Sequence, residues 1–373
     1  MKTTPSYMTA AVLTGFGGLE KLEIRHDVPV PKIASTDVLI EVGGCGINNT
    51  DINTRAGWYN RSVKVGTTIE GGTRGFALAE EEHSGGGEGA FEFPRIQGAD
   101  VSGIISKVGT KISPERLGER VLVDPLIREL KPKESSYQGQ YLGNGIDGGF
   151  AQFCKVPAVN AITLNSSLTT EELATLPCSY STAELMLTRS KLSHTDTVVI
   201  TGASGGVGSA AVQLAKKRGS FVIALTTKKK MKAMEALNPD VVLDRNLPDL
   251  LTAVRKVSPR GEVDVVVDVV GGVNFSVWID CLRRKGRYVT SGAIGGPIVE
   301  LDLRSLYLKD LLLVGATELP MKVFSDLIRY IENGEIKPLL AQTFALEDIH
   351  EAQRVFMNKE HIGNLVVVPP RSS

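Results

Sequence analysis

Two patterns of hydrophobic and polar positions divide the chain. Before residue 169, short runs alternate branched apolar with polar residues and end at glycines or prolines, which predicts β-strands. From residue 197, apolar strands alternate with segments of helical spacing. The early strands are predicted at residues 9–13, 21–25, 37–43, 98–108 and 118–124. The later strands are predicted at residues 197–201, 221–225, 241–243, 263–270 and 286–291, and the helices between them at residues 206–218, 228–237, 247–257 and 273–283.

The alternating pattern predicts a parallel sheet with helices on both faces. A strand at residues 311–315 follows, and the helix near residues 323–333 and the strand at residues 364–368 indicate a return to the first domain. We therefore expect an α/β protein in which a mainly β domain is interrupted by an αβ domain. The predicted boundaries are 1–170 for the first part, 171–315 for the inserted domain and 316–373 for the return.

One segment fits neither pattern. Residues 62–93 hold eight glycines and three consecutive glutamates, with almost no periodicity. Long loops of this kind in compact domains are often lids or disordered segments. The sequence favours a partly ordered flap; the alternative is a passive surface insertion.

A glycine-rich turn follows the strand at residues 197–201 and leads into an amphipathic helix. Small residues there let the backbone approach a pyrophosphate, which binds the N–H groups and the positive end of the helix. A glycine triplet alone is weak evidence, but its place between a parallel strand and a helix is typical of dinucleotide binding. The alternative is a tight turn without a ligand. The predicted contacts of this turn are Ser204, Gly205, Gly206, Val207 and Gly208.

The end of the next strand distinguishes NAD from NADP. NAD sites usually place an acidic residue there for the ribose hydroxyls, yet the first acidic residue after this strand is Glu235. The segment carries Thr226, Thr227, Lys228 and Lys230 instead. Lysines at a helix start are unfavourable against the helix dipole unless an anion lies nearby. The pattern favours NADPH, whose 2′-phosphate these residues would bind; the alternative is a solvated lysine cluster.

Composition narrows the range of functions. The 42 Lys and Arg residues balance the 42 Asp and Glu residues, so we expect neither nucleic acid nor a membrane surface as a partner. No segment approaches the roughly 18 apolar residues of a membrane span, and the N-terminus lacks an apolar signal region. We expect a cytoplasmic protein. Four cysteines, none in a C-x-x-C pair, leave little for a thiolate zinc site.

Several motifs together resemble the medium-chain dehydrogenase/reductase superfamily. They are the turn at residues 203–208, the Gly-Ile-Asn-Asn-Thr-Asp segment at residues 46–51 and the Gly-Arg-Tyr-Val strand at residues 286–289. The chain looks closest to the zinc-independent quinone oxidoreductase-like branch. The resemblance implies a GroES-like catalytic domain and an inserted Rossmann domain with a doubly wound sheet. It also implies cofactor contacts from Thr182, Val270, Ala293 and Ile294, and the loss of one contact at Asn364, where the family commonly has lysine.

The resemblance also locates the metal positions of the zinc-dependent alcohol dehydrogenases. These positions carry Asn48, Ala99 and Cys178, so two of the three ligands are missing, and residues 124–148 lack the cysteines of the structural zinc loop. A rearranged site of Cys45, Asp100 and Cys178 is an alternative, although it contains no histidine. We predict no bound metal and interpret Cys178 as a small buried hydrophobe.

A site without metal favours conjugate reduction over alcohol oxidation. Alcohol oxidation needs the hydroxyl proton removed and the alkoxide held, a task that the metal performs by Lewis acidity. A quinone or an α,β-unsaturated carbonyl is already electrophilic and needs only donors that stabilise the developing enolate. The predicted catalytic residues are Asn48, Tyr59 and Asp51. Two simpler interpretations are a surface ion pair between Asp51 and Arg55, and a packing role for Tyr59.

Three functional hypotheses follow. The first is an NADPH-dependent reductase of quinones or enones, including enoyl thioesters. The second is an alcohol or aldehyde dehydrogenase with an absent or atypical metal site. The third is a non-catalytic NADPH-binding protein. By resemblance we also expect a homodimer that forms through the edge strand at residues 311–315.

Overall fold

The chain folds into two compact units that interrupt each other in sequence. The computed structural model describes residues 4–76, 85–86, 91–128 and 139–371. The first unit comprises Met1–Val63, Thr68–Cys178 and Pro338–Ser373, and the second Lys64–Thr67 and Ser179–Lys337. The expected insertion of an αβ domain into a mainly β domain is present.

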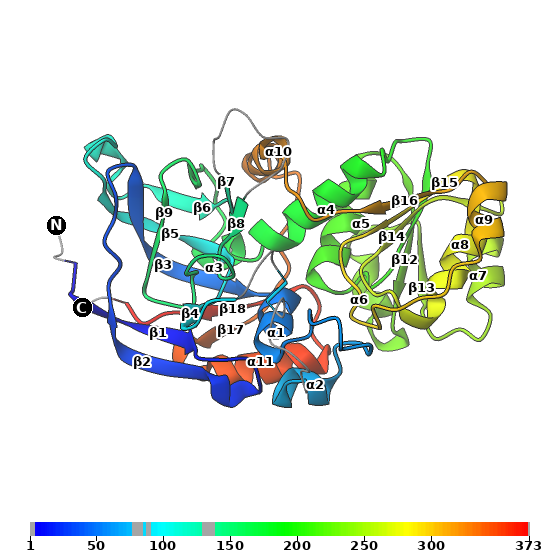
Figure 1. The fold of residues 1–373 in the computed structure, drawn as a ribbon. Coiled ribbons are helices and arrows are strands. Elements are labelled where there is room, and N and C mark those ends of the chain that lie inside the picture. Colours follow the sequence, from blue (N-terminus) through cyan, green and yellow to red (C-terminus); the bar gives the residue numbers. More distant parts are fainter. Residues whose placement is uncertain (1–3, 77–84, 87–90, 129–138, 372–373) are drawn as a thin grey trace. The chain divides into compact units, whose positions relative to one another are not determined.

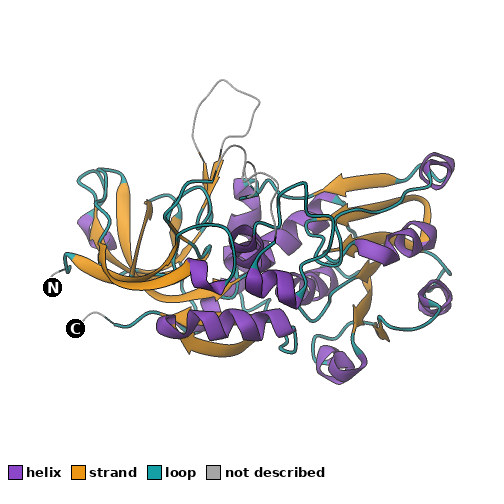
Figure 2. Ribbon diagram, turned by 60° about the horizontal axis from the view of Figure 1, so that its bottom comes forward, coloured by secondary structure: helices purple, strands orange, loops and turns teal. Residues whose placement is uncertain are grey.

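The first unit is built mainly from antiparallel strands (Figures 1 and 2). Its long central strand β3 pairs with β5, β9 and β18, and this sheet continues through β6 to β10 and through β18 to β17. The strands are β1 (Tyr7–Leu13), β2 (Leu22–Pro29), β3 (Asp37–Ile47), β4 (Arg95–Ile96), β5 (Asp100–Val108), β6 (Arg120–Val123), β7 (Leu126–Arg128), β8 (Gly139–Tyr141), β9 (Phe153–Pro157), β10 (Ala161–Thr163), β17 (Leu340–Ala345) and β18 (Asn364–Val368). The helices are α1 (Asn49–Ala56), α2 (Ile69–Arg74), α3 (Thr170–Leu173) and α11 (Ile349–Asn358).

The second unit contains a parallel sheet in the order β13-β12-β11-β14-β15-β16. Because the order reverses direction at β11, the sheet is doubly wound, and the predicted α/β fold class is confirmed. The strands are β11 (Thr197–Ile200), β12 (Phe221–Thr226), β13 (Val241–Asp244), β14 (Val263–Asp268), β15 (Leu282–Thr290) and β16 (Leu312–Gly315). The helices are α4 (Pro177–Arg189), α5 (Gly206–Lys217), α6 (Met231–Glu235), α7 (Leu250–Val257), α8 (Phe275–Cys281), α9 (Leu303–Leu308) and α10 (Met321–Glu332).

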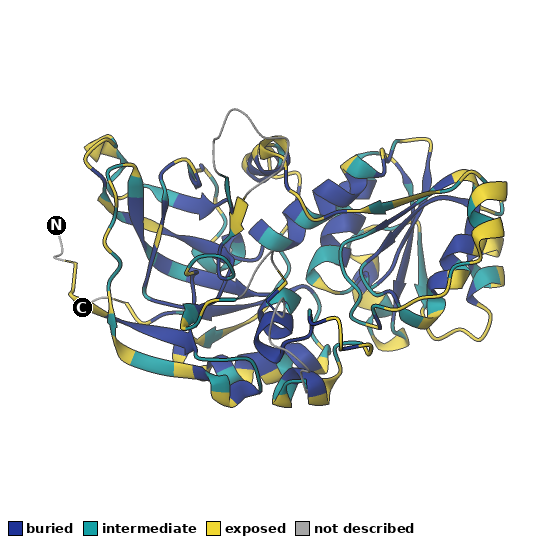
Figure 3. Cartoon of the chain, in the orientation of Figure 1, coloured by how far each residue is buried: buried dark blue, intermediate teal, exposed yellow. Residues whose placement is uncertain are grey.

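Burial on both faces explains the apolar strands of this sheet. Val198, Val199 and Ile200 are all fully buried, although successive side chains of a strand point to opposite faces. One face packs against apolar residues of α7 and α8, and α5 lies against β11 and β12. Figure 3 shows the central strands buried along most of their length.

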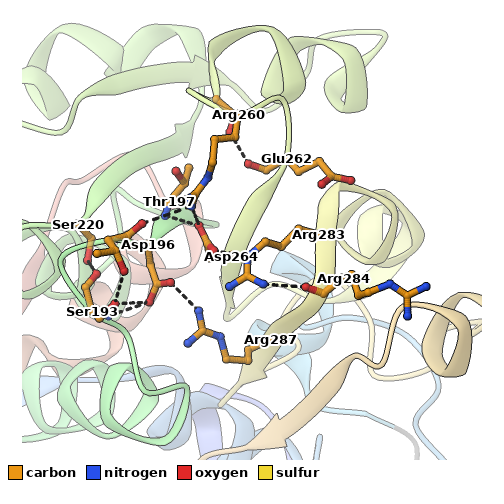
Figure 4. A network of polar contacts seen from close by, with 12 residues as sticks. Ser193, Asp196, Thr197, Ser220, Arg260, Glu262, Asp264, Arg283, Arg284 and Arg287 are labelled. Atoms are coloured by element: carbon orange, nitrogen blue, oxygen red, sulfur yellow. Dashed lines mark hydrogen bonds and ion pairs between the residues drawn. The ribbon is translucent and has the colours of Figure 1, made fainter.

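Ion pairs connect the amino ends of three adjacent strands (Figure 4). The buried Asp264 carboxylate of β14 accepts from the Thr197 backbone N–H at 2.8 Å and pairs with Arg260 and Arg283. Asp196 lies before β11 and pairs with Arg287 of β15 at 2.8 Å. Ion pairs therefore hold the amino ends of these strands together. The opposite, carboxyl end of the sheet carries the glycine-rich turn.

The structure differs from the sequence-based predictions in several features. Residues 69–74 form α2, where no periodicity had indicated structure; the Thr68 hydroxyl accepts from the Gly71 N–H at its start. The predicted helix at residues 273–283 ends at Cys281, because β15 already begins at Leu282. The first unit resumes at residue 338 rather than 316. Helix α10 stays with the second unit, where Lys217 packs on its Tyr330 and pairs with Glu335 just after the helix.

Candidate active site

The first element of the site is the N-terminus of α1. Asn48 is its N-cap, in an extended conformation directly after β3. The backbone N–H of Asn48 donates to Asp51 Oδ2 at 2.7 Å, and the Asp51 side chain is buried. Asp51 therefore fixes the start of the helix on which Asn48 is presented.

The carboxylate of Asp100 connects Asn48 to Cys178. Asp100 begins β5 and lies opposite Gly46 of β3. Asn48 Nδ2 donates to its Oδ2 at 2.9 Å, and the backbone N–H of Cys178 donates to its Oδ1 at 2.6 Å. Both oxygens of a side chain that is only 1% exposed are thus in use.

Burial dominates the titration of the two carboxyl groups. Loss of hydration raises the pKa of Asp51 to about 7 against the opposing hydrogen bonds from Asn48 and Gly98. Burial also raises the pKa of Asp100 to about 7; the hydrogen bonds from Asn48 and Cys178 oppose this, and the nearby Asp51 charge adds to it. Both groups therefore change protonation state near neutral pH.

Two tyrosines belong to the same cluster. The Tyr59 hydroxyl donates to Thr50 Oγ1 at 3.5 Å, and Tyr141 hydrogen-bonds the Cys178 side chain. Burial raises the pKa of both phenols, so both remain protonated donors at neutral pH. The sequence indicated Tyr59 but gave no signal for Tyr141, which lies in a segment without a recognisable motif.

Arg55 has a different role from the one its spacing suggests. Its side chain is fully buried and donates to Gln353 Oε1 at 2.9 Å, to the Gly17 carbonyl at 3.0 Å and to the Gly72 carbonyl at 2.6 Å. Burial lowers its pKa to about 10. The surface ion pair with Asp51 is therefore wrong as an interpretation: Asp51 and Arg55 are both buried and have different partners.

Part of the glycine-rich insertion packs on α1 and Tyr59. The Gly85 carbonyl accepts from Thr54 Oγ1 at 3.2 Å and from Asn144 Nδ2 at 2.5 Å. A Cβ atom on Gly86 would lie 2.6 Å from the Tyr59 ring. This contact limits the positions open to the Tyr59 ring; residues 77–84 and 87–90 of the predicted flap lie outside the described residues.

The side chains at the family's metal positions do not suit zinc. Asn48, Ala99 and Cys178 supply one thiol among them, and the Asn48 amide is bonded to Asp100. The Cys45 thiol is directed to the Gly46 carbonyl, and burial raises its pKa well above the usual range. Within the described residues, no group of three His, Cys, Asp or Glu side chains is placed to hold a metal ion.

The second unit presents the dinucleotide turn at the carboxyl end of its sheet. Gly205 is the N-cap of α5, and Gly202 has a positive φ of 57°. A Cβ atom on Gly208 would lie 2.2 Å from the Gly202 carbonyl oxygen, so only glycine allows this tight turn. The turn brings the predicted residues from Ser204 to Gly208 together at the start of a twelve-residue helix, which suits a pyrophosphate.

Asp268 holds the loops around this turn, a role that the sequence reading missed. Its Oδ1 accepts from Thr201 Oγ1 at 2.6 Å and from the Val270 N–H at 2.8 Å, and its Oδ2 accepts from the Tyr288 hydroxyl at 2.7 Å. The carboxyl ends of β11, β14 and β15 are therefore joined by one fully buried carboxylate. An acidic residue at the end of an apolar strand was the available signal.

The remaining predicted cofactor residues lie at the same end of this unit or on α4. The Val270 carbonyl accepts from the Gly295 N–H at 2.7 Å, which brings Val270 beside the Ala293–Ile294 segment. Thr182 is half-buried on α4. Thr226, at the end of β12, has a buried hydroxyl without a hydrogen-bond partner among the described residues.

The segment after Thr226 carries the lysines. Thr227 is half-buried, and Lys228 to Lys230 form one 3-10 turn in which Lys228 is exposed. The exposed Lys228 side chain suits an anionic ligand. Asn364, in contrast, is buried in β18 of the first unit.

Two family models match the chain. The alcohol dehydrogenase GroES-like domain matches residues 34–166, and the zinc-binding dehydrogenase domain matches residues 206–333. A crystal structure from Sinorhizobium meliloti 1021, provisionally assigned as an alcohol dehydrogenase, is 43% identical, covers 98% of both chains and has a TM-score of 0.89.

Two curated relatives extend the comparison. Acryloyl-coenzyme A reductase of Sulfurisphaera tokodaii is 27% identical over 97% of this chain and 100% of its own. Human quinone oxidoreductase is 25% identical over 94% of both chains.

No helix in the described ranges has the length and apolar character needed to cross a membrane.

Proposed function

Since the chain belongs to the medium-chain dehydrogenase/reductase superfamily and is an oxidoreductase of that kind, we propose that it uses NADPH to reduce a conjugated carbonyl compound without catalytic zinc. The substrate would be a small quinone or α,β-unsaturated carbonyl, including enoyl thioesters. Relatives named for quinone and for acryloyl-coenzyme A reduction support this substrate class.

One observation carries the proposal: two of the positions that the resemblance assigns to metal ligands, Asn48 and Cys178, both donate hydrogen bonds to a buried carboxylate. The Asn48 amide and the Cys178 N–H both bind Asp100. A site with this donor set lacks a Lewis acid for an alkoxide. It can still stabilise the enolate oxygen that develops during conjugate addition, because hydrogen-bond donors suffice for that task.

The chain's residues would then act as donors and positioning groups. The cofactor, when bound, supplies the hydride. Asn48 uses one Nδ2 proton for Asp100 and has a second for the substrate oxygen. Tyr59 is protonated at neutral pH and would hold that oxygen or supply the proton to the neighbouring carbon. Asp51 acts through the helix start that it caps.

The preference for NADPH rests on the end of β12. Thr226 offers a buried, unpartnered hydroxyl, and the lysines follow directly. A 2′-phosphate would supply acceptors to the lysine ammonium groups. An acidic residue for the ribose hydroxyls of NAD is absent from residues 226–234.

A second candidate function is alcohol or aldehyde oxidation, favoured by the 43% identical chain assigned as an alcohol dehydrogenase. The two are separated by following NADPH consumption with a panel of quinones, enones and enoyl thioesters, and NADP⁺ reduction with a panel of alcohols. The proposal expects turnover in the first panel that persists after dialysis against a chelator. Turnover only with alcohols, restored by zinc, would replace it with the second function. NADPH binding without turnover in either panel would support the non-catalytic alternative.

A further inference from the structure

Three chain segments that are distant in sequence meet at the carboxylate of Asp100. They are the start of α1 at Asn48, the start of β5 and the backbone at Cys178. By the resemblance stated above, these segments correspond to those that hold the catalytic metal in the zinc-dependent members of the family. Hydrogen bonds between protein groups alone therefore cross-link these segments.

We propose that Asp100 is a positioning residue that replaces the metal as the cross-link of this site and orients the Asn48 amide toward the substrate oxygen. The part concerning the substrate rests on the function proposed above. The cross-link itself stands on the two hydrogen bonds, 2.9 Å from Asn48 Nδ2 and 2.6 Å from the Cys178 N–H.

The need for a carboxylate follows from the number of donors. Each oxygen of Asp100 accepts one N–H from a different segment, and both oxygens are buried. An amide in its place has only one acceptor atom and would direct its NH2 group at the other donor. A buried donor that loses its acceptor is destabilised by its lost hydration. Asparagine should therefore preserve half of the cross-link, and alanine none.

Fixing the amide rotamer has a direct consequence for catalysis. An unrestrained Asn side chain can exchange its oxygen and nitrogen positions by rotation about its last bond. With Nδ2 held by Asp100, the second proton of the same nitrogen keeps a defined direction. A preorganised donor stabilises developing charge better than one that must first be ordered.

The neighbouring thiols do not offer a competing role for Asp100. Cys45 is fully buried and directed to the Gly46 carbonyl, and Cys178 is engaged through its side chain by Tyr141. A metal at Cys45, Asp100 and Cys178 would have to break both Asp100 hydrogen bonds or share their acceptors. The existing contacts favour the cross-link.

The kinetic test compares Asp100→Asn, Asp100→Ala, Asn48→Ala and the Asn48→Ala/Asp100→Ala double variant. Asp100→Ala should lower kcat for an enone by about 10- to 100-fold, as loss of a supporting partner does at other sites, with an unchanged KM for NADPH. Asp100→Asn should be intermediate. In the Asn48→Ala background, the further replacement Asp100→Ala should lower kcat only slightly more. Asp124→Asn, at another buried aspartate of this unit, is the matched control and should keep the wild-type kcat.

Two kinetic results would overturn the proposal. One is an Asp100→Ala variant with the kcat of the wild type. The other is an equal loss of kcat from Asp100→Ala in the wild-type and Asn48→Ala backgrounds, because Asp100 would then act independently of Asn48.

Thermal unfolding tests the cross-link without any substrate. Asp100→Ala should lower the Tm less in the Asn48→Ala background than in the wild type, because one of its partners is already gone. Equal losses in both backgrounds would contradict the cross-link. If the wild type reduces no quinone or enone, the proposed function fails while this Tm comparison still decides the cross-link.

Discussion

Asp51 and Asp100 show how buried carboxyl groups shape this protein at the scale of single residues. Both have a pKa raised to about 7, from 3.8 in the unfolded chain, chiefly because burial penalises the charged form. Between these values the folded protein retains protons that the unfolded chain has released. The unfolding free energy contributed by these groups therefore falls as the pH rises from about 4 to 7.

This fall in stability with rising pH gives a prediction for Asp100→Asn, which removes one of the two titrating groups. The stability of the variant relative to the wild type should increase as the pH rises through that interval, measured by denaturant unfolding at several pH values. The control is Asp264→Asn. Burial would raise the pKa of Asp264, but the Thr197 N–H and Arg283 outweigh it and lower the pKa. The relative stability of that variant should be constant above about pH 4; parallel curves for both variants would contradict the account.

The lysines after β12 determine the predicted cofactor preference. Replacing Lys228 and Lys230 with alanine should raise the KM for NADPH by about tenfold or more, since charge-assisted contacts to a phosphate are among the strong hydrogen bonds. NADH kinetics should change little. Asp268→Asn is the contrasting variant, because it loosens the loops of the whole turn and should weaken both cofactors. Equal weakening of NADPH and NADH by the lysine variant would refute the 2′-phosphate assignment.

At the residue scale, the catalytic roles drawn from a motif stay predictions, but the positions of these residues can be compared with the structure. Asn48, Asp51 and Tyr59 were selected from one short segment, and the structure places them in one cluster. Sequence reasoning missed Asp100 as a partner of Asn48. The two are 52 residues apart, and only the pairing of β3 with β5 brings them together. Tyr141 was missed because its segment carries no recognisable motif.

At the scale of elements, periodicity was reliable where burial repeats regularly. The strands β11, β12 and β14 and helix α5 lie where the pattern placed them, because both faces of a parallel sheet must be apolar. Helix α2 was missed because its six residues include two glycines in close contacts; a Cβ on Gly72 would meet Met357. Its packing depends on a distant helix that no local pattern reveals.

The insertion gives a prediction at this scale. Gly86→Ala should displace the Tyr59 ring and lower turnover, measured as kcat with the best substrate of the panel. Gly118→Ala is a matched control: its φ of 83° is close to the 84° of Gly86, yet an added Cβ meets nothing within 4 Å. Both variants should lose similar stability from the left-handed backbone, about 1–2 kcal/mol. Equal turnover in the two would show that the Gly86 contact does not constrain Tyr59.

At the scale of the whole molecule, the expected homodimer remains a proposal about the edge of the parallel sheet. Leu312 and Leu313 of β16 are exposed, as are Tyr307 and Leu308 of the preceding helix. Exposed apolar edge strands readily pair with another chain. The fold class follows from the alternation of strands and helices, but no sequence pattern fixes the partner of this edge.

Lysine substitutions test the dimer. Leu312→Lys with Leu313→Lys should shift the protein from dimer to monomer in sedimentation velocity, because charges on an edge strand oppose pairing. Met321→Lys, an exposed apolar position on α10, should leave the assembly unchanged. An unchanged sedimentation coefficient in the double variant would move the interface elsewhere.

The central claim is that the protein transfers hydride to a conjugated carbon without a metal. The most direct measurement uses chelator-treated protein and NADPH deuterated at C4, with an enone as substrate, and locates the deuterium in the product by NMR. The account predicts a saturated ketone with deuterium on the carbon β to the carbonyl. Deuterium on the carbonyl carbon of an alcohol, with activity that returns only when zinc is added, would contradict it.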